Sequence, residues 1–190
     1  MVLAIVIGVT ASGIGGVSAS EVVSPVECTV RPISELDLVA IVEIGTPAAT
    51  VSPVFEATGE PVDDKTAEAI TDLVLQSVAC PNANHPMRAY AHFTDRYLIA
   101  RFGGDNQDDL GHLLAALTRE PAFASETDRL SLDSVAELTA LADGRISANV
   151  TTSNSSATFI DTLTFARDAD DWLIDEVILD STEFTPAPAS

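Results

Sequence analysis

The order of the hydrophobic periodicities constrains the fold of this chain more than any other feature of its sequence. Apolar residues first recur at helical spacing in three segments, at about 63–80, 86–103 and 107–118. From Val135 onward the period changes to two, which is typical of half-buried strands. Because the helices precede the strands and do not alternate with them, the pattern predicts an α+β fold.

The predicted helices carry recognisable boundary residues. Pro81 is expected to end the first helix. Pro86 opens the second and Gly103 stops it, which follows the usual preference for proline at helix starts and glycine after helix ends. In the third helix, four leucines follow the i, i+3, i+4, i+7 spacing of a buried face: Leu110, Leu113, Leu114 and Leu117.

The second half of the chain predicts an antiparallel meander. Its expected strands are about 135–142, 145–152, 157–167 and 172–180. Asp143-Gly144 is a hairpin signal between the first two strands, and polar turns separate the others. A meander of this kind buries one face of its sheet, so the preceding helices are expected to cover that face.

Residues 1–19 have the composition of a secretory signal peptide. They contain no charged residue, twelve hydrophobic residues and four glycines, and they end in the small residues Val17-Ser18-Ala19. A membrane anchor is the alternative, but glycines at this density weaken it. The segment predicts export, with cleavage after Ala19 and no membrane attachment of the processed protein. The mature chain is therefore expected to be secreted or extracytoplasmic.

The chain contains two cysteines, Cys28 and Cys80. In an oxidising compartment such a pair is expected to form a disulfide, and the loop it closes would contribute about 4 kcal/mol on the chain-entropy model. Two buried free thiols are the alternative. Neither cysteine belongs to a C-x-x-C pair, so zinc and thioredoxin-type redox functions are not indicated.

These features divide the chain into four parts. After the signal peptide, residues 20–62 are predicted to form an extended segment tied to the body by Cys28, and Ser34 could cap a short helical piece within it. Residues 63–181 form the predicted globular domain. Residues 182–190 are predicted to be a disordered tail.

The net charge excludes two classes of partner. The chain has 29 acidic and 9 basic residues, which gives a formal net charge of −20. Binding to nucleic acid requires clustered Lys and Arg against the phosphates, and anionic membranes repel a chain this acidic. A hydrophobic content of 46% also excludes the composition of a disordered acidic tail. An acidic globular domain remains.

Three local sequences strengthen one family resemblance. Residues 88–98, Arg-Ala-Tyr-Ala-His-Phe-Thr-Asp-Arg-Tyr-Leu, resemble the second helix of SnoaL-like, nuclear transport factor 2-like proteins. Residues 138–146 resemble their hairpin, and 171–175 their closing strand. The resemblance extends over about 63–181 and includes an exported bacterial subset with a Cys-bearing N-terminal segment. It implies a cone-shaped fold, in which three N-terminal helices pack on a curved antiparallel sheet of four or more strands.

The resemblance leaves the function open, because this family includes isomerases, cyclases, dehydratases and non-catalytic domains. It implies an exported domain that binds a small apolar ligand or another protein, without a cofactor and without an identified catalytic set. One alternative is an isomerase-, cyclase- or dehydratase-type enzyme that uses a pocket carboxylate or histidine for proton transfer. Another is a structural homodimer formed through the outer sheet face.

Two pairs of residues in the second predicted helix are candidates for a site. His92 and Asp95 are three positions apart, a spacing that suits a base and its orienting carboxylate but also suits a solvated charged face. Tyr90 and Tyr97 could donate hydrogen bonds to a ligand, or they could be core aromatic residues. The three histidines of the chain form no metal-ligand set, so no metal is predicted.

A third candidate lies on a predicted strand. The alternation in 157–167 places Asp161 on the apolar face, with Phe159 as a further ligand-binding candidate. Desolvation there would raise the pKa of a carboxyl group and suit it for proton transfer, whereas a rim, edge or convex position would not. Asp175 follows the same pattern on the last strand, in competition with its neighbour Glu176.

Overall fold

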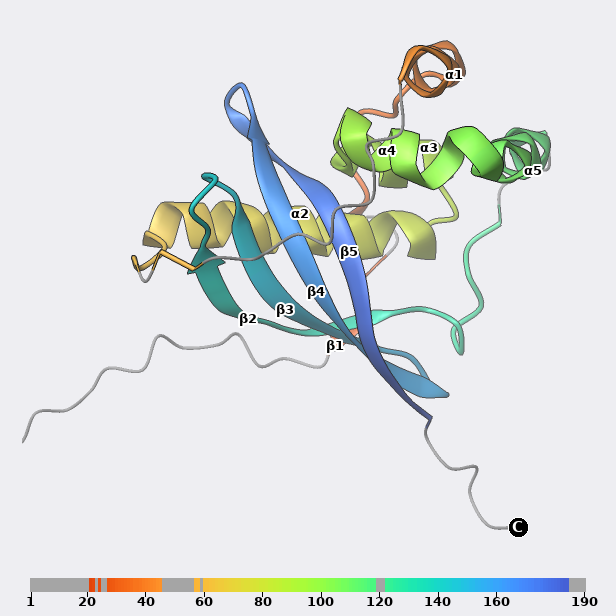
Figure 1. Cartoon of the computed structure of the whole chain (residues 1–190). Helices are drawn as coiled ribbons and strands as arrows, with labels where there is room; N and C mark the ends of the chain where they lie inside the picture. The colour runs from red at the N-terminus through yellow and green to blue at the C-terminus, as the bar shows by residue number, and fades with distance from the viewer. Residues whose placement is uncertain are drawn as a thin grey trace, which may run out of the picture.

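A computed structural model describes residues 21–22, 24, 27–45, 57–58, 60–118 and 122–184 (Figure 1). Within these residues the fold is α+β, with helices preceding four long antiparallel strands, as the periodicities predict. The predicted signal peptide, 1–19, lies outside the described residues, and so does most of the predicted tail.

The helices occupy the first half of the described chain. Their bounds are α1 (Glu35–Ile44), α2 (Asp64–Asn82), α3 (Pro86–Ala89), α4 (Asp95–Phe102) and α5 (Gln107–Leu117), with 3-10 helices at Tyr90–His92 and Gly104–Asn106. Ser34 caps α1 and Asp63 caps α2; each side chain accepts a hydrogen bond of 3.0 Å from a backbone N–H three residues later. The helix at Ser34 and the helices predicted over 63–80 and 107–118 are thus confirmed.

The prediction of one continuous helix over 86–103 is wrong. Phe93 has an extended backbone (φ −111°, ψ 148°) and forms a parallel bridge with Ile174. The N–H of Thr94 then donates to the carbonyl of Ile174 at 3.0 Å, and α4 begins after this residue. A tertiary contact with the sheet therefore interrupts a segment whose local pattern favours a helix.

The first predicted helix also ends later than expected. Pro81 lies inside the last turn of α2, which continues to Asn82. The Asn82 side chain donates to the carbonyl of Leu130 at 2.9 Å and accepts from its N–H at 2.8 Å. These two bonds fix the C-terminal end of α2 beside the chain that enters the sheet.

The strands form one antiparallel sheet in sequence order. They are β1 (Glu21–Val22), β2 (Ser131–Ala140), β3 (Ile146–Ser153), β4 (Ala157–Asp168) and β5 (Asp171–Phe184). The hairpin at Asp143-Gly144 is confirmed, and Gly144 adopts the positive φ of +85° that such a turn favours. Strand β5 pairs with β4 as far as Phe184. It thus takes up the first three residues of the predicted 182–190 tail.

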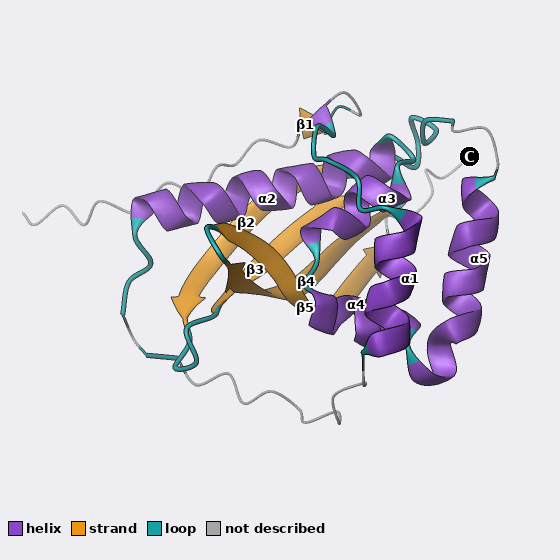
Figure 2. Ribbon diagram, turned by 90° about the horizontal axis from the view of Figure 1, so that it is seen from above, coloured by secondary structure: helices purple, strands orange, loops and turns teal. Residues whose placement is uncertain are grey.

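One group of buried side chains joins α2 to the sheet, and a second joins three other helices to one another. Helix α2 lies across one face of the curved sheet (Figures 1 and 2). There Ile70 and Val74 pack in one cluster with Phe165 of β4 and Ile174 of β5, and each of these four side chains is at most 1% exposed. Helices α1, α4 and α5 gather beside β5 around a second cluster, which consists of Leu38, Val42, Leu98, Phe102 and Leu110.

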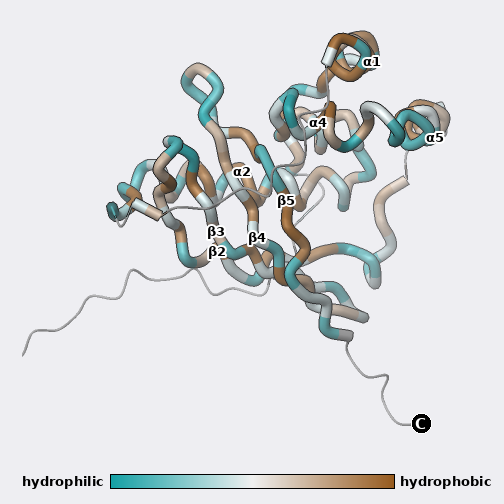
Figure 3. Tube along the Cα trace, viewed as in Figure 1, coloured by the Kyte–Doolittle hydropathy of each residue, from teal (hydrophilic) through white to brown (hydrophobic). Residues whose placement is uncertain are grey.

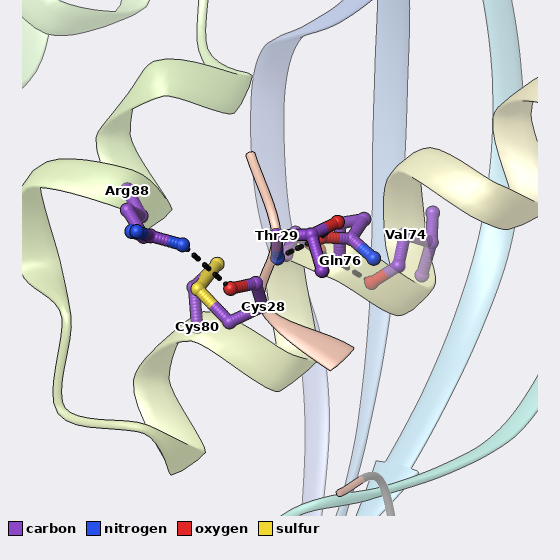
Figure 4. Close-up of a disulfide and its surroundings, with 7 residues drawn as sticks. Cys28, Thr29, Val74, Gln76, Cys80 and Arg88 are labelled. Carbon is purple, nitrogen blue, oxygen red and sulfur yellow. Dashed lines mark hydrogen bonds between the residues drawn. A yellow bond between two sulfur atoms is a disulfide. The ribbon is translucent and has the colours of Figure 1, made fainter. Parts of the chain in front are cut away.

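The predicted disulfide between Cys28 and Cys80 is confirmed, and the two cysteines are therefore not free thiols (Figure 4). It joins the segment before α1 to the last turn of α2, and both cysteines are buried. Arg88 donates to the carbonyl of Cys28 at 2.8 Å, and the N–H of Thr29 donates to Gln76 at 2.9 Å. A buried disulfide fits an oxidising, extracytoplasmic compartment. In the part of the chain that the structure describes, no helix is both long and apolar enough to cross a membrane.

We expect the double variant Cys28→Ser/Cys80→Ser to lose about 4 kcal/mol of unfolding free energy, because a crosslink across 52 residues restricts the unfolded chain. Urea unfolding of the oxidised wild type and of the variant measures this difference. Thiol titration of the unreduced wild type is the control and should find no free thiol. Two titratable thiols, or equal stabilities, would contradict the prediction.

Two glycines should respond oppositely to alanine. A Cβ on Gly45 would lie 2.2 Å from Cδ1 of Ile99 and 2.8 Å from the carbonyl oxygen of Ile41, so Gly45→Ala forces the Ile99 side chain and the end of α1 to shift and should cost about 1–3 kcal/mol. A Cβ on Gly111 meets no atom within 4 Å, so Gly111→Ala should stabilise α5 by about 0.5–1 kcal/mol. Thermal unfolding of both variants checks the pair. A Gly45→Ala variant as stable as wild type would contradict the close approach of Gly45 to Ile99, and a destabilised Gly111→Ala variant would contradict the open surroundings of Gly111.

Candidate functional site

A buried carboxylate, Asp175 on β5, is the centre of a network of charged groups. Its side chain is 6% exposed. Arg96 of α4 donates from Nε to Oδ1 at 2.9 Å and from Nη2 to Oδ2, and Thr94 donates to Oδ1 at 2.8 Å. Arg145 donates from Nη1 to Oδ2 at 3.0 Å and also pairs with Asp143 at the hairpin turn. The network joins α4, the β2–β3 turn and β5.

A β-bulge positions this carboxylate. Thr164 of β4 is opposite Glu176 of β5, whereas Phe165 is opposite Ile174, so Asp175 is the extra residue on its strand. Ile174 belongs to the core cluster under α2, and Val177 packs against the same cluster. The bulge shifts the alternation by one residue between them, which the period-two pattern alone could not show.

The electrostatics keep Asp175 ionised. Burial by itself raises the pKa of this carboxyl, but the hydrogen bonds from Arg96 and Thr94 and the charge of Arg96 outweigh burial, so its pKa lies below the ordinary value. The neighbouring Glu176 has its Oε2 3.9 Å from a guanidinium nitrogen of both Arg96 and Arg145. A carboxylate held by two arginines is a poor proton donor or acceptor, and the arrangement is best suited to joining elements.

The structure separates His92 from Asp95. His92 lies in the 3-10 helix before the break and is 4% exposed, whereas Asp95 is exposed in the first turn of α4. The helical spacing on which the pair was predicted is therefore absent, and among the described contacts no hydrogen bond joins the two residues. Burial lowers the pKa of His92 to about 4, and its Nε2 has no hydrogen-bond partner.

Tyr90 and Tyr97 pack among aromatic side chains of the helical layer. The Tyr90 ring contacts Phe102 edge-on with centroids 5.0 Å apart, and the Tyr97 ring stacks on Phe93 at 4.3 Å. Both tyrosines pack against the cluster between α1, α4 and α5, and burial raises the pKa of each. Their rings thus contribute to packing, and a ligand contact through either hydroxyl stays a prediction.

Asp161 lies on the sheet face that α2 covers. It pairs in register with the buried Val150 of β3, and residues directly opposite in an antiparallel pair share a face. Phe159, two residues away, shares this face opposite Thr152. Asp161 is half-buried, and burial followed by the charge of Asp180 raises its pKa. Within the described contacts nothing joins Asp161 to His92 or to either tyrosine, so the predicted site residues are not brought together.

A groove between α1 and α4 is a candidate site that the sequence pattern did not predict. It has a volume of about 450 Å³ and is lined by Asp37, Ala40, Ile41, Ile44, Gly45, Asp95 and Ile99. Of its lining residues, Ile44 is 85% exposed, and Leu36 of α1, which does not line it, is 83% exposed. Seven of the ten residues of α1 are apolar, yet only Leu38 and Val42 are buried. In Figure 3 much of α1 has the colour of hydrophobic residues although the helix lies at the periphery.

This composition of α1 was the signal in the sequence. The capping residue Ser34 predicts only that a short helix begins there, whereas the apolar residues that follow it outnumber the two that this helix buries. A helix with seven apolar residues in ten is expected to bury more than two of them. Among the described residues, the packing partners of α1 lie on the side of Leu38 and Val42.

The described residues contain no group of three or more His, Cys, Asp or Glu that could hold a metal ion. Comparisons with protein-family models, curated proteins and solved structures find no match to this chain.

The buried His92 should make stability depend on pH. Its pKa is about 4 in the folded protein and about 6.5 in the unfolded chain, so between these values the unfolded state binds an extra proton. Stability should therefore fall on acidification from pH 6.5 to 4, with His92 contributing on the order of 3 kcal/mol of that fall. Urea unfolding across this range measures it.

The variant His92→Gln isolates this contribution. Its stability at neutral pH is free to change, but its loss between pH 6.5 and 4 should be smaller than that of wild type. His112→Gln, at an exposed position on α5, is the matched control and should keep the wild-type slope. Equal slopes for His92→Gln and wild type would show that the folded protein protonates His92 readily.

Proposed function

We propose that this chain is an exported interaction domain of the SnoaL-like type, which binds a partner through the groove between α1 and α4. The observation that carries the proposal is the exposed apolar side of α1. Leu36, Ala40 and Ile44 follow at i, i+4 and i+8 on this helix, and all three are exposed. Apolar surface arranged in this way marks interaction sites in folded proteins.

The polar groups favour an interaction domain over an enzyme. The charge of Asp175 is neutralised by Arg96 and Arg145, and His92 has no carboxylate partner among the described residues. General acid–base catalysis needs a titratable group near a second group that orients it or the substrate. The described contacts of Asp161, His92 and Asp95 do not supply that arrangement.

The family assignment and the export are parts of the same proposal. Helices that precede a curved antiparallel sheet, with one long helix across a face of it, support a cone-type fold. The disulfide between Cys28 and Cys80 supports passage through an oxidising compartment, as the signal-like segment 1–19 predicts.

A small-molecule site near Asp161 is the second candidate. The half-buried carboxylate with its raised pKa lies on the α2 side of the sheet, where a cone-type fold would hold a ligand. The two candidates place apolar binding on different elements, α1 for the interaction domain and β4–β5 for the ligand site. Variants can therefore separate them.

We expect the neutral apolar dye Nile red to bind the native protein at α1. The double variant Leu36→Ser/Ile44→Ser removes two exposed side chains, so its unfolding free energy should stay within about 0.5 kcal/mol of wild type. Its dye fluorescence should fall about fivefold or more, because the apolar stripe is lost. Fluorescence titration of both folded proteins measures the difference.

Leu179→Ser/Phe123→Ser is the matched control, since these side chains are 80% and 62% exposed, on β5 and in the loop between α5 and β2. It should keep the dye signal. Leu179 is opposite Asp161 in the β4–β5 register. Loss of dye binding in this control, with retention in the α1 variant, would overturn the proposal in favour of a ligand site on the sheet.

A further inference from the structure

We propose that the partner segment that occupies the α1–α4 groove is a cationic amphipathic helix of another protein. This inference rests on the proposed function and adds the chemistry of the partner. It combines three properties of the groove: its length, its apolar floor and the sign of its charges.

The length of the apolar stripe suits a helix. Leu36, Ala40 and Ile44 span two turns of α1, about 12 Å along its axis. The groove beside them is bounded by α1 and by α4, whose Ile99 contributes to the floor. A shallow apolar groove between two helices is a common seat for the apolar face of a third helix, which anchors residues at i, i+3 or i+4 and i+7.

The rim of the groove is acidic. Asp37 of α1 and Asp95 of α4 line it, and no basic residue is among its lining residues. The only basic residues of α4, Arg96 and Arg101, already pair with Asp175 and Asp109. The described contacts therefore leave the negative charge of the rim uncompensated. Lys or Arg flanking the apolar face of a partner helix would complement it.

A second copy of this chain is a poor occupant. A two-fold contact through the apolar stripe of α1 would place the acidic residues that flank it, Asp37 and Glu43, near the same residues of the partner protomer. Like charges at close range oppose such pairing, and each protomer carries a net charge of −20. An anionic lipid surface is repelled for the same reason. A positively charged partner is instead attracted over a long range, which raises its association rate at low salt.

The experiment uses two synthetic peptides of about 14 residues, each with Leu at i, i+3, i+4 and i+7. One carries Lys at the remaining positions and the other Glu. By fluorescence anisotropy at about 50 mM salt, the Lys peptide should bind the full-length protein at least tenfold more tightly than the Glu peptide. Its affinity should weaken as the salt concentration rises, and Leu36→Ser/Ile44→Ser should abolish binding.

The charge variant is Asp37→Asn/Asp95→Asn, which should weaken binding of the Lys peptide about fivefold. The matched control is Glu68→Gln/Asp72→Asn on the exposed side of α2, which changes the net charge equally and should leave the affinity nearly unchanged. Equal weakening by both variants would show non-specific attraction and overturn the inference. Equal binding of both peptides, or self-association that competes with the Lys peptide, would also overturn it.

The dye and peptide experiments together distinguish a failure of this inference from a failure of the proposed function. If Nile red binds at α1 but the Lys peptide shows no preference over the Glu peptide, the interaction surface stands and the inference about partner charge fails. If neither the dye nor the peptide depends on Leu36 and Ile44, both fail.

Discussion

The attachment of residues 93–94 to the edge of β5 fixes the position of α4 against the sheet. Thr94 makes three interactions at this point. Its N–H donates to the carbonyl of Ile174, its hydroxyl donates to Asp175, and the same hydroxyl oxygen accepts from the N–H of Tyr97 to cap α4. Thr94 therefore links the helix break, the start of α4 and the buried ion pair of Asp175. The groove depends on this junction because α4 forms one of its walls.

Local sequence patterns predicted most of the elements but not this junction. The caps at Ser34 and Asp63, the leucine spacing of α5 and the hairpin at Asp143-Gly144 depend on neighbours within a few residues. The break at Phe93 depends on Ile174, eighty-one positions away. No local propensity records such a contact. The bulge at Asp175 was hidden for the same reason, since only the pairing of β4 with β5 defines it.

The candidate site shows a different limit of sequence reasoning. The face of Asp161 followed correctly from alternation, because β4 keeps its register with β3 through that region. The sequence did not predict the proposed interaction site, because the exposure of an apolar side chain cannot be known before its packing partners are known. The sequence of α1 shows seven apolar residues but does not show which of them are buried. Only the peripheral position of α1 in the structure shows that Leu36 and Ile44 are exposed and could contact a partner.

The disulfide has a further consequence for a protein exposed to proteases. Cys28 precedes α1 and Cys80 follows it, so the crosslinked loop contains α1 and most of α2. A single cut anywhere within that loop leaves both pieces covalently joined until the disulfide is reduced. The helix that bears the apolar stripe would thus remain part of the molecule after cleavage, and its local concentration beside α4 would stay high.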